Sequence, residues 1–254
     1  MMSVKHDLKL ACMFTVGLTL AVAPASAQWS AGVAAIGSAT PYEGLSTESI
    51  VIPIVAYEGE RLIWRGPSLR YKLTGVKRGE PSLQISVELA PNELEADQSA
   101  ELVGIEERDI SFLAGLRYVH PSKIGEFSAV FQTDITGKHN GQRGALNFQR
   151  PLLRDKQGAW VLTGGIQVEY LSDNYADYYF GVSAVEEAAS SFSQYRVDDV
   201  WQGGITLGGF YRFNDKWQLT AQTRLISLAN EVKDSPIVAD SATFDGFIGV
   251  TYQF

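Results

Sequence analysis

The stretch Phe244-Asp-Gly-Phe-Ile-Gly-Val-Thr-Tyr-Gln-Phe254 decides the fold of this chain. Apart from Phe247, the residues between its apolar positions are small or polar. A period of two predicts a β-strand with one apolar and one polar face. A soluble β-sandwich strand has the same pattern, so the assignment depends on the rest of the chain. Counting back from the end, the apolar, aromatic or glycine positions are Phe254, Tyr252, Val250, Ile248, Gly246 and Phe244.

The amino-terminal segment has the pattern of a secretory signal peptide. Two lysines precede an uncharged run from Leu10 to Ala23, and Ala25-Ser-Ala27 follows as a cleavage site. The run is too short for a membrane-spanning helix. We therefore expect a cleaved signal peptide over residues 1–27 and an exported mature protein over residues 28–254.

Composition excludes several classes of function. The net charge of −8 at pH 7 argues against nucleic acid as a partner. After residue 27 no uncharged apolar stretch approaches the roughly 18 residues of a membrane helix, so a membrane-embedded mature chain must be a closed barrel. The single cysteine, Cys12, falls in the expected signal peptide. The histidines lack metal-ligand spacing, and we expect no metal and no cofactor.

Alternating segments recur along the mature chain. In residues 81–90, Leu83, Ile85, Val87 and Leu89 alternate with polar residues. Such segments of about ten residues, separated by turns, are typical of transmembrane barrels. Further alternating segments lie at 109–118, 126–134, 160–170 and 217–225, and weaker ones at 29–37, 48–57, 61–72, 142–150 and 200–213.

Two features favour lipid over a soluble sandwich as the environment of these strands. Aromatic residues cluster at strand ends, as the interfacial belts of a membrane barrel require. The polar faces carry acids and arginines that can pair across a lumen. We therefore predict an all-β fold, a transmembrane antiparallel up-and-down β-barrel in the bacterial outer membrane. The aromatics are Trp29, Trp64, Trp160, Tyr170, Trp201, Tyr211, Phe213, Trp217, Tyr252 and Phe254, and the charges are Glu88, Asp109, Arg117, Glu126, Asp134, Glu169, Arg224 and Asp245.

The number of alternating segments differs from the number of strands that a barrel can have. Eleven segments alternate, with the closing one included, whereas single-chain bacterial barrels have an even number of strands. We expect ten or twelve strands and prefer twelve, with the missing strand in 171–199 or in a misinterpreted 91–108. The tight turn Asn214-Asp-Lys216 is expected at the periplasmic end, and 171–199 and 229–242 as external loops.

Two of the connecting segments have features of their own. Residues 92–108 hold six acids against one arginine, with a helical turn expected at Ser99–Gly104. This segment is either a solvated acidic loop or a site for a cation or basic partner. Residues 184–190 predict a short helix, with Ser183 as N-cap and Glu186 completing a capping box.

One block in the second segment resembles the MltA-interacting protein (MipA)/OmpV family of outer-membrane proteins. The block is Asn174-Tyr175-x-x-Tyr178-Tyr179-Phe180-Gly181-Val182-Ser183. The resemblance implies an outer-membrane barrel without established catalytic residues. The namesake of the family is associated, as a scaffold, with a murein lytic transglycosylase and a murein synthase, and other members are described as porin-like or adhesin-like. Supporting matches are Pro41-Tyr42-x-Gly44, Pro53, Arg65-Gly66-Pro67-Ser68-Leu69 and Ser235-Pro236-Ile237-Val238.

The expected partners follow from the location and the resemblance. They are outer-membrane lipid, the barrel-assembly machinery, and a murein lytic transglycosylase or synthase. Tyr252 and Phe254 resemble the closing-strand signal by which the assembly machinery recognises outer-membrane barrels. The motif residues have two compatible roles, because buried aromatics can fold the loop over the barrel mouth and tyrosines can form a recognition surface. These residues are Asn174, Tyr175, Tyr178, Tyr179, Phe180 and Gly181.

Three functions stay open at this point. The first is a structural scaffold for peptidoglycan enzymes. The second is a small porin-like channel for small polar solutes, although side chains could also fill the lumen of a barrel of this size. The third is a lipid A-modifying hydrolase, with Ser122 as nucleophile, His120 as base and Glu126 as orienting carboxylate. Because Pro121-Ser-Lys-Ile-Gly125 predicts a tight turn between strands, we do not expect an enzyme.

Overall fold

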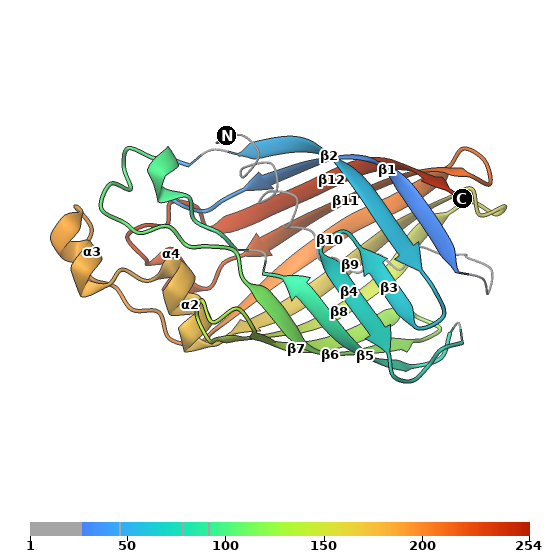
Figure 1. The fold of residues 1–254 in the computed structure, drawn as a ribbon, viewed down its shortest axis with the longest axis horizontal. Helices are drawn as coiled ribbons and strands as arrows, with labels where there is room; N and C mark the ends of the chain where they lie inside the picture. The colour runs from blue at the N-terminus through green and yellow to red at the C-terminus, as the bar shows by residue number, and fades with distance from the viewer. Residues whose placement is uncertain (1–26, 46, 78, 91) are drawn as a thin grey trace.

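The computed structural model describes residues 27–254 apart from positions 46, 78 and 91 (Figure 1). In this part of the chain, twelve strands close an antiparallel barrel in which each strand pairs with its sequence neighbours and β1 pairs with β12. The predicted twelve-stranded up-and-down barrel is confirmed, while residues 1–26 of the expected signal peptide lie outside the described residues. The strands are β1 (Gln28–Ala39), β2 (Glu48–Glu58), β3 (Leu62–Arg65), β4 (Ser68–Lys72), β5 (Ser82–Leu89), β6 (Phe112–Pro121), β7 (Glu126–Asp134), β8 (Gln142–Arg154), β9 (Trp160–Leu171), β10 (Val200–Arg212), β11 (Trp217–Ser227) and β12 (Ala242–Gln253).

The alternation of each strand separates an apolar outer face from a polar lumen. On β12, Phe244 and Ile248 are about half exposed, whereas Asp245 between them is buried. The same division holds on β6, where Leu116 points outward and Arg117 is buried. An exposed apolar band around a closed barrel is the surface that lipid covers, so the outward side chains need no dry core.

Charged side chains pair inside the lumen, as the sequence predicted, except that Asp109 lies exposed in the β5–β6 loop and pairs with Lys138. Glu88 on β5 lies 3.2 Å from Arg117 and 3.9 Å from Arg70. Buried charges persist when they are paired and hydrogen-bonded, and here one carboxylate serves two guanidinium groups. Two further pairs are Arg143 with Glu169, and Arg224 with Asp245 at 2.6 Å.

The missing strand lies in a place that the sequence analysis did not anticipate. Residues 61–72 form not one strand but a hairpin of β3 and β4, joined by Gly66 and Pro67. Gly66 is the first of the two central residues and has a φ of +53°, which glycine adopts readily in tight hairpins. The expectation of a hidden strand in 171–199 or 91–108 is therefore wrong.

Short helices gather at one end of the barrel, while the carboxy terminus and the short turns lie at the other (Figure 1). Long external loops and short periplasmic turns are the usual arrangement, so the helical end is the external one. The predicted helix at 184–190 is confirmed with its capping box. The 3-10 helix of the acidic segment lies at Ala96–Gln98, before the helical turn expected at Ser99–Gly104, where the chain makes hydrogen-bonded turns instead. None of the described helices has the length and apolar character needed to cross a membrane. The helices are α2 (Asp173–Phe180), α3 (Ala184–Ala189) and α4 (Asn230–Lys233).

The hydrophobic core of the molecule lies at this external end and not in the barrel. Its members come from the loops β1–β2, β5–β6, β9–β10 and β11–β12 and from the strand ends next to them. We call this assembly the cap. Its largest fully buried side chains include Tyr42, Tyr175, Tyr179, Phe180, Leu94, Leu102 and Ile237.

Replacing Glu88 with glutamine should destabilise the barrel. The change leaves Arg70 and Arg117 facing each other without an anion, and breaking a buried ion pair typically costs about 3 kcal/mol or more. We expect a lower urea midpoint for unfolding of the reconstituted protein, followed by tryptophan fluorescence. Glu60→Gln, in an exposed turn, is the matched control, and equal midpoints for the two variants would contradict the role of Glu88.

Candidate functional site

The tyrosine motif forms helix α2, which the sequence analysis did not identify as a helix. Tyr175 and Tyr179 are four residues apart, so they lie on one face of the helix, and both are fully buried with Phe180. Asn174 is exposed on the other side, and Tyr178 is half-buried. Most of the motif therefore packs the cap together, and the structure leaves its expected role in recognition as a prediction.

The phenol groups of the motif and of Tyr42 connect separate loops. Tyr42 donates a hydrogen bond to the Tyr179 carbonyl at 3.2 Å, and Tyr175 donates to the Asn92 side chain at 2.9 Å. Tyr178 accepts from the Asp109 amide at 3.1 Å. Burial raises the pKa of Tyr42, Tyr175 and Tyr179 well above the usual range, so these three phenols stay protonated.

Gly181 ends the motif at the C-terminus of α2. Its amide donates to the Asp177 carbonyl at 2.8 Å, and a Cβ on this glycine would overlap both that carbonyl and the Asp177 carboxylate. The residue is therefore fixed as glycine by close packing. The lack of room for a side chain explains why glycine stands at this position of the block, without contact to a partner.

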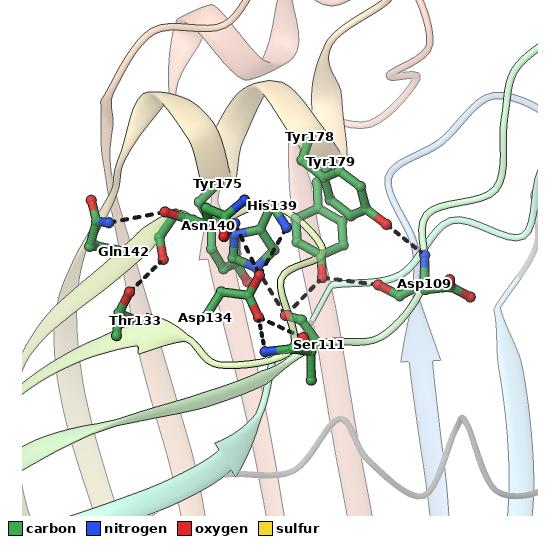
Figure 2. Close-up of polar contacts among 12 residues, drawn as sticks. Asp109, Ser111, Thr133, Asp134, His139, Asn140, Gln142, Tyr175, Tyr178 and Tyr179 are labelled. Carbon is green, nitrogen blue, oxygen red and sulfur yellow. Dashed lines mark hydrogen bonds and ion pairs between the residues drawn. The ribbon is translucent and has the colours of Figure 1, made fainter.

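A serine, a histidine and an aspartate meet beneath α2, at the ends of β6 and β7 (Figure 2). Ser111 Oγ lies 2.9 Å from His139 Nε2, and Asp134 Oδ2 lies 4.0 Å from the same nitrogen. His139 also packs against the rings of Tyr175 and Tyr179. These residue types suggest a nucleophile, a base and an orienting acid, so the direction of each hydrogen bond decides what the cluster can do.

The hydrogen bonds assign a structural role to this cluster. The Gly141 amide donates to His139 Nδ1 at 2.9 Å, so Nδ1 carries no proton and Nε2–H donates to Ser111. A base for Ser111 would need the opposite arrangement, with the aspartate on the other ring nitrogen. The Asp134 carboxylate is already occupied by the amides of Thr136, His139 and Asn140.

The acidic segment is anchored to α3 by its one arginine. Arg108 pairs with Glu186 at 2.5 Å, and its Nε donates to the Tyr178 carbonyl. Glu186 also accepts the amide of Glu106 and closes the capping box of α3. The sequence showed Arg108 only as a lone basic residue among acids, and this isolation was the available signal for its anchoring role.

The residues considered for lipid A hydrolysis do not form a nucleophile–base pair. Ser122 donates its hydroxyl to the Gly125 carbonyl at 2.6 Å, within the predicted turn. His120 points outward and stacks on Tyr118, whose hydroxyl lies 3.4 Å from Nδ1. The histidine is thus an interfacial residue at the periplasmic end.

The closing strand ends in an aromatic ladder. Tyr252 packs edge-on against Trp217 and Phe254, with ring centroids 5.2 Å apart in each case. The Phe254 amide donates to the Trp29 carbonyl, and its ring is exposed. Both residues are accessible from the membrane side, and their role as an assembly signal stays a prediction.

A closed twelve-stranded barrel with an apolar outer band, aromatic belts and a charged interior belongs to the class of outer-membrane β-barrel proteins. A family model described as MltA-interacting protein MipA matches residues 31–254. The chain therefore belongs to the MltA-interacting protein family, as the sequence resemblance predicted. It is an outer-membrane protein, and its relatives are named accordingly.

Three relatives illustrate the similarity. "MltA-interacting protein" of Escherichia coli (strain K12) is 29% identical over 96% of this chain and 98% of its own length. "Putative outer membrane protein YiaT" of the same strain is 26% identical over 90% of this chain and 92% of its own. "Outer membrane protein OmpV" of Vibrio cholerae serotype O1 is 24% identical over 89% of this chain and 86% of its own.

Two solved structures match most of this chain at low identity and low TM-score. OprG from Pseudomonas aeruginosa is 13% identical, with 91% of this chain and 96% of that chain covered and a TM-score of 0.29. A Pseudomonas aeruginosa FadL homologue is 10% identical, with 90% and 89% covered and a TM-score of 0.40.

Acidification should loosen the cap around His139. Burial lowers the pKa of His139 from 6.5, and the nearby Asp134 carboxylate only partly opposes this effect. Because the unfolded state then binds more protons, the contribution of neutral His139 is complete above pH 6.5 and is lost as the pH falls below it. We expect faster amide hydrogen exchange in α2 at pH 5.5 than at pH 7.5, after correction for intrinsic exchange.

His139→Gln provides the control, because glutamine does not titrate in this range. The variant should lose the pH dependence in α2 even if its exchange is faster at every pH. An α2 segment whose corrected exchange depends on pH equally in both proteins would place the titrating group elsewhere.

Proposed function

We propose that this barrel is an outer-membrane scaffold that docks a murein-hydrolysing enzyme on its periplasmic face. The observation that carries the proposal is the full-length match to the MltA-interacting protein family, including a relative named for that interaction. This relative is 29% identical to the present chain, and only this class of role is carried over from it.

The narrow space under the cap favours a scaffold over a channel. A cavity between the cap and the lumen, lined in part by Tyr42, Glu169 and Arg224, measures only about 40 Å³. Such a space holds a few water molecules, not a continuous water column. The buried ion pairs that line it and the packed cap next to it oppose passage of a polar solute.

The periplasmic end offers a surface suited to a protein partner. The β8–β9 hairpin extends with exposed Leu152 and Leu153, flanked by the exposed Arg150, Arg154 and Lys156. Exposed apolar residues bordered by charge are typical of interaction sites, and the basic charge would steer an acidic partner surface. The external cap has exposed negative charge instead, with acids such as Glu187, Asp198 and Asp199.

Charge reversal on this hairpin should weaken capture of the enzyme. In crosslinked outer membranes, we expect the tagged wild-type protein to enrich a murein lytic transglycosylase. The triple variant Arg150→Glu, Arg154→Glu, Lys156→Glu should lose about tenfold or more of this enrichment, because rim charges control association. Mass spectrometry with an unrelated barrel as reference measures the enrichment.

The matched control reverses three exposed charges at the other end of the barrel. Glu187→Lys, Asp198→Lys, Asp199→Lys should leave the enrichment unchanged. Equal enrichment by the wild-type protein and the unrelated barrel would refute the scaffold. The porin-like channel for small polar solutes would then be tested by conductance in planar bilayers, where a closed lumen predicts none.

A further inference from the structure

The barrel wall is incomplete on one side of its external half. β2 pairs with β3 only through Ala56–Glu58, although the same strand pairs with β1 from Glu48 to Glu58. On the other side of the hairpin, β4 pairs with β5 only up to Val87. Since β3 and β4 meet at the Gly66–Pro67 turn, the described residues form no strand ladder between β2 and β5 on the external side of this turn (Figure 1).

The edge of β2 at this gap cannot complete a ladder with another strand. The Val55 carbonyl accepts the Gly66 amide at 3.4 Å, so the backbone groups of Val55 face the gap. In an antiparallel strand, alternate residues face the same side, which places Pro53 and Val51 toward the gap as well. Proline has no amide hydrogen, and such an edge resists pairing with an added strand. The geometry therefore disfavours a polypeptide partner here.

The outer side of the gap in strand pairing faces lipid. Val51 and Val55 border it with outward side chains that are 70% and 42% exposed. Val51 lies in the same hydrogen-bonded row as Ala35 on β1 and Ile248 on β12, and Ile248 belongs to the exposed apolar band. The wall at this level faces hydrocarbon, where unpaired backbone groups are tolerated only beside a polar interior.

A groove on the outer surface leads to the lower edge of the gap. It has a volume of about 550 Å³, within the usual size of a small-molecule site, and it ends at the Gly66–Pro67 turn. Trp29 packs against Tyr57 and Trp64 within it, and the Trp64 indole donates to the Gly66 carbonyl. The remaining walls are Leu62 and Leu69. The groove therefore fits an alkyl chain.

The lumen behind the gap has an excess of positive charge. Arg70 and Arg117 lie there and share one acid, Glu88. Arg70 is buried, and its Nε has no hydrogen-bond partner among the described residues. A buried guanidinium N–H without an acceptor is costly, so an anionic group at this point would stabilise it.

We propose that this gap is a lateral binding site for an anionic amphiphile with a single alkyl chain. The carboxylate of a fatty acid would meet Arg70 in the lumen, and its chain would cross the Gly66–Pro67 turn into the aromatic groove. The site is separate from the periplasmic hairpin and does not depend on the scaffold role.

Photolabelling of the full-length protein in lipid vesicles tests the site. A photoreactive fatty acid should label residues 57–69, as located by mass spectrometry, and its methyl ester should not favour this segment. Arg70→Gln should lower labelling by the acid about tenfold or more, the scale of one lost charge-assisted hydrogen bond. Arg224→Gln, the same change at the Asp245 pair on the other wall, should have no effect.

A second pair of variants avoids the lumen and any loss of folding there. Trp64 and Trp160 are both 37% exposed on the aromatic belt, but only Trp64 lines the groove. Trp64→Ala should reduce labelling and Trp160→Ala should not. Labelling spread evenly around the barrel, equal labelling by acid and ester, or equal effects of Trp64→Ala and Trp160→Ala would overturn the proposal.

Discussion

A polypeptide in lipid must satisfy every backbone amide and carbonyl within itself, and this constraint organises the whole molecule. The chain meets it by closing β1 on β12, so that the lipid-facing wall is paired around its circumference except at the short β3–β4 hairpin. Once the wall is closed, each strand needs only a uniform outer face and a uniform inner face. The apolar side chains of the strands then contact lipid. Polar side chains and ion pairs lie inside the barrel, where a soluble sandwich would have a dry core.

This division explains which parts of the fold the sequence could predict. Strands such as β12 show clear alternation because lipid and lumen impose opposite demands on successive residues. The β3–β4 hairpin was not predicted because apolar residues occur on both sides of the turn in 61–72. The sequence nevertheless contains a signal for two strands. The outward residues are Leu62 and Trp64 before the turn but Leu69 and Tyr71 after it, and this change from even to odd positions is incompatible with one continuous strand.

The candidate site was only partly predictable for a different reason. The capping box of α3 is local and could be identified from Ser183 and Glu186. The cluster of Ser111, Asp134 and His139 depends on loops that are far apart in sequence, and no spacing rule brings them together. Its composition resembles a catalytic site, but the proton positions imposed by Gly141 make it a support for α2. Residue types alone would therefore have suggested the wrong chemistry.

The cap has a consequence for the order in which the molecule assembles. Its core joins loops from both sides of the β1–β12 seam, with Tyr42 from the first loop bridged to Val238 from the last. The bridge spans almost the whole chain, so the contacts of Tyr42 in the core can form only after the ends of the barrel meet. Completion of the cap is thus a late event. The aromatic motif of α2 then contacts the loops on both sides of the seam, through Tyr42 and Ser235, and stabilises the closed barrel from the external side.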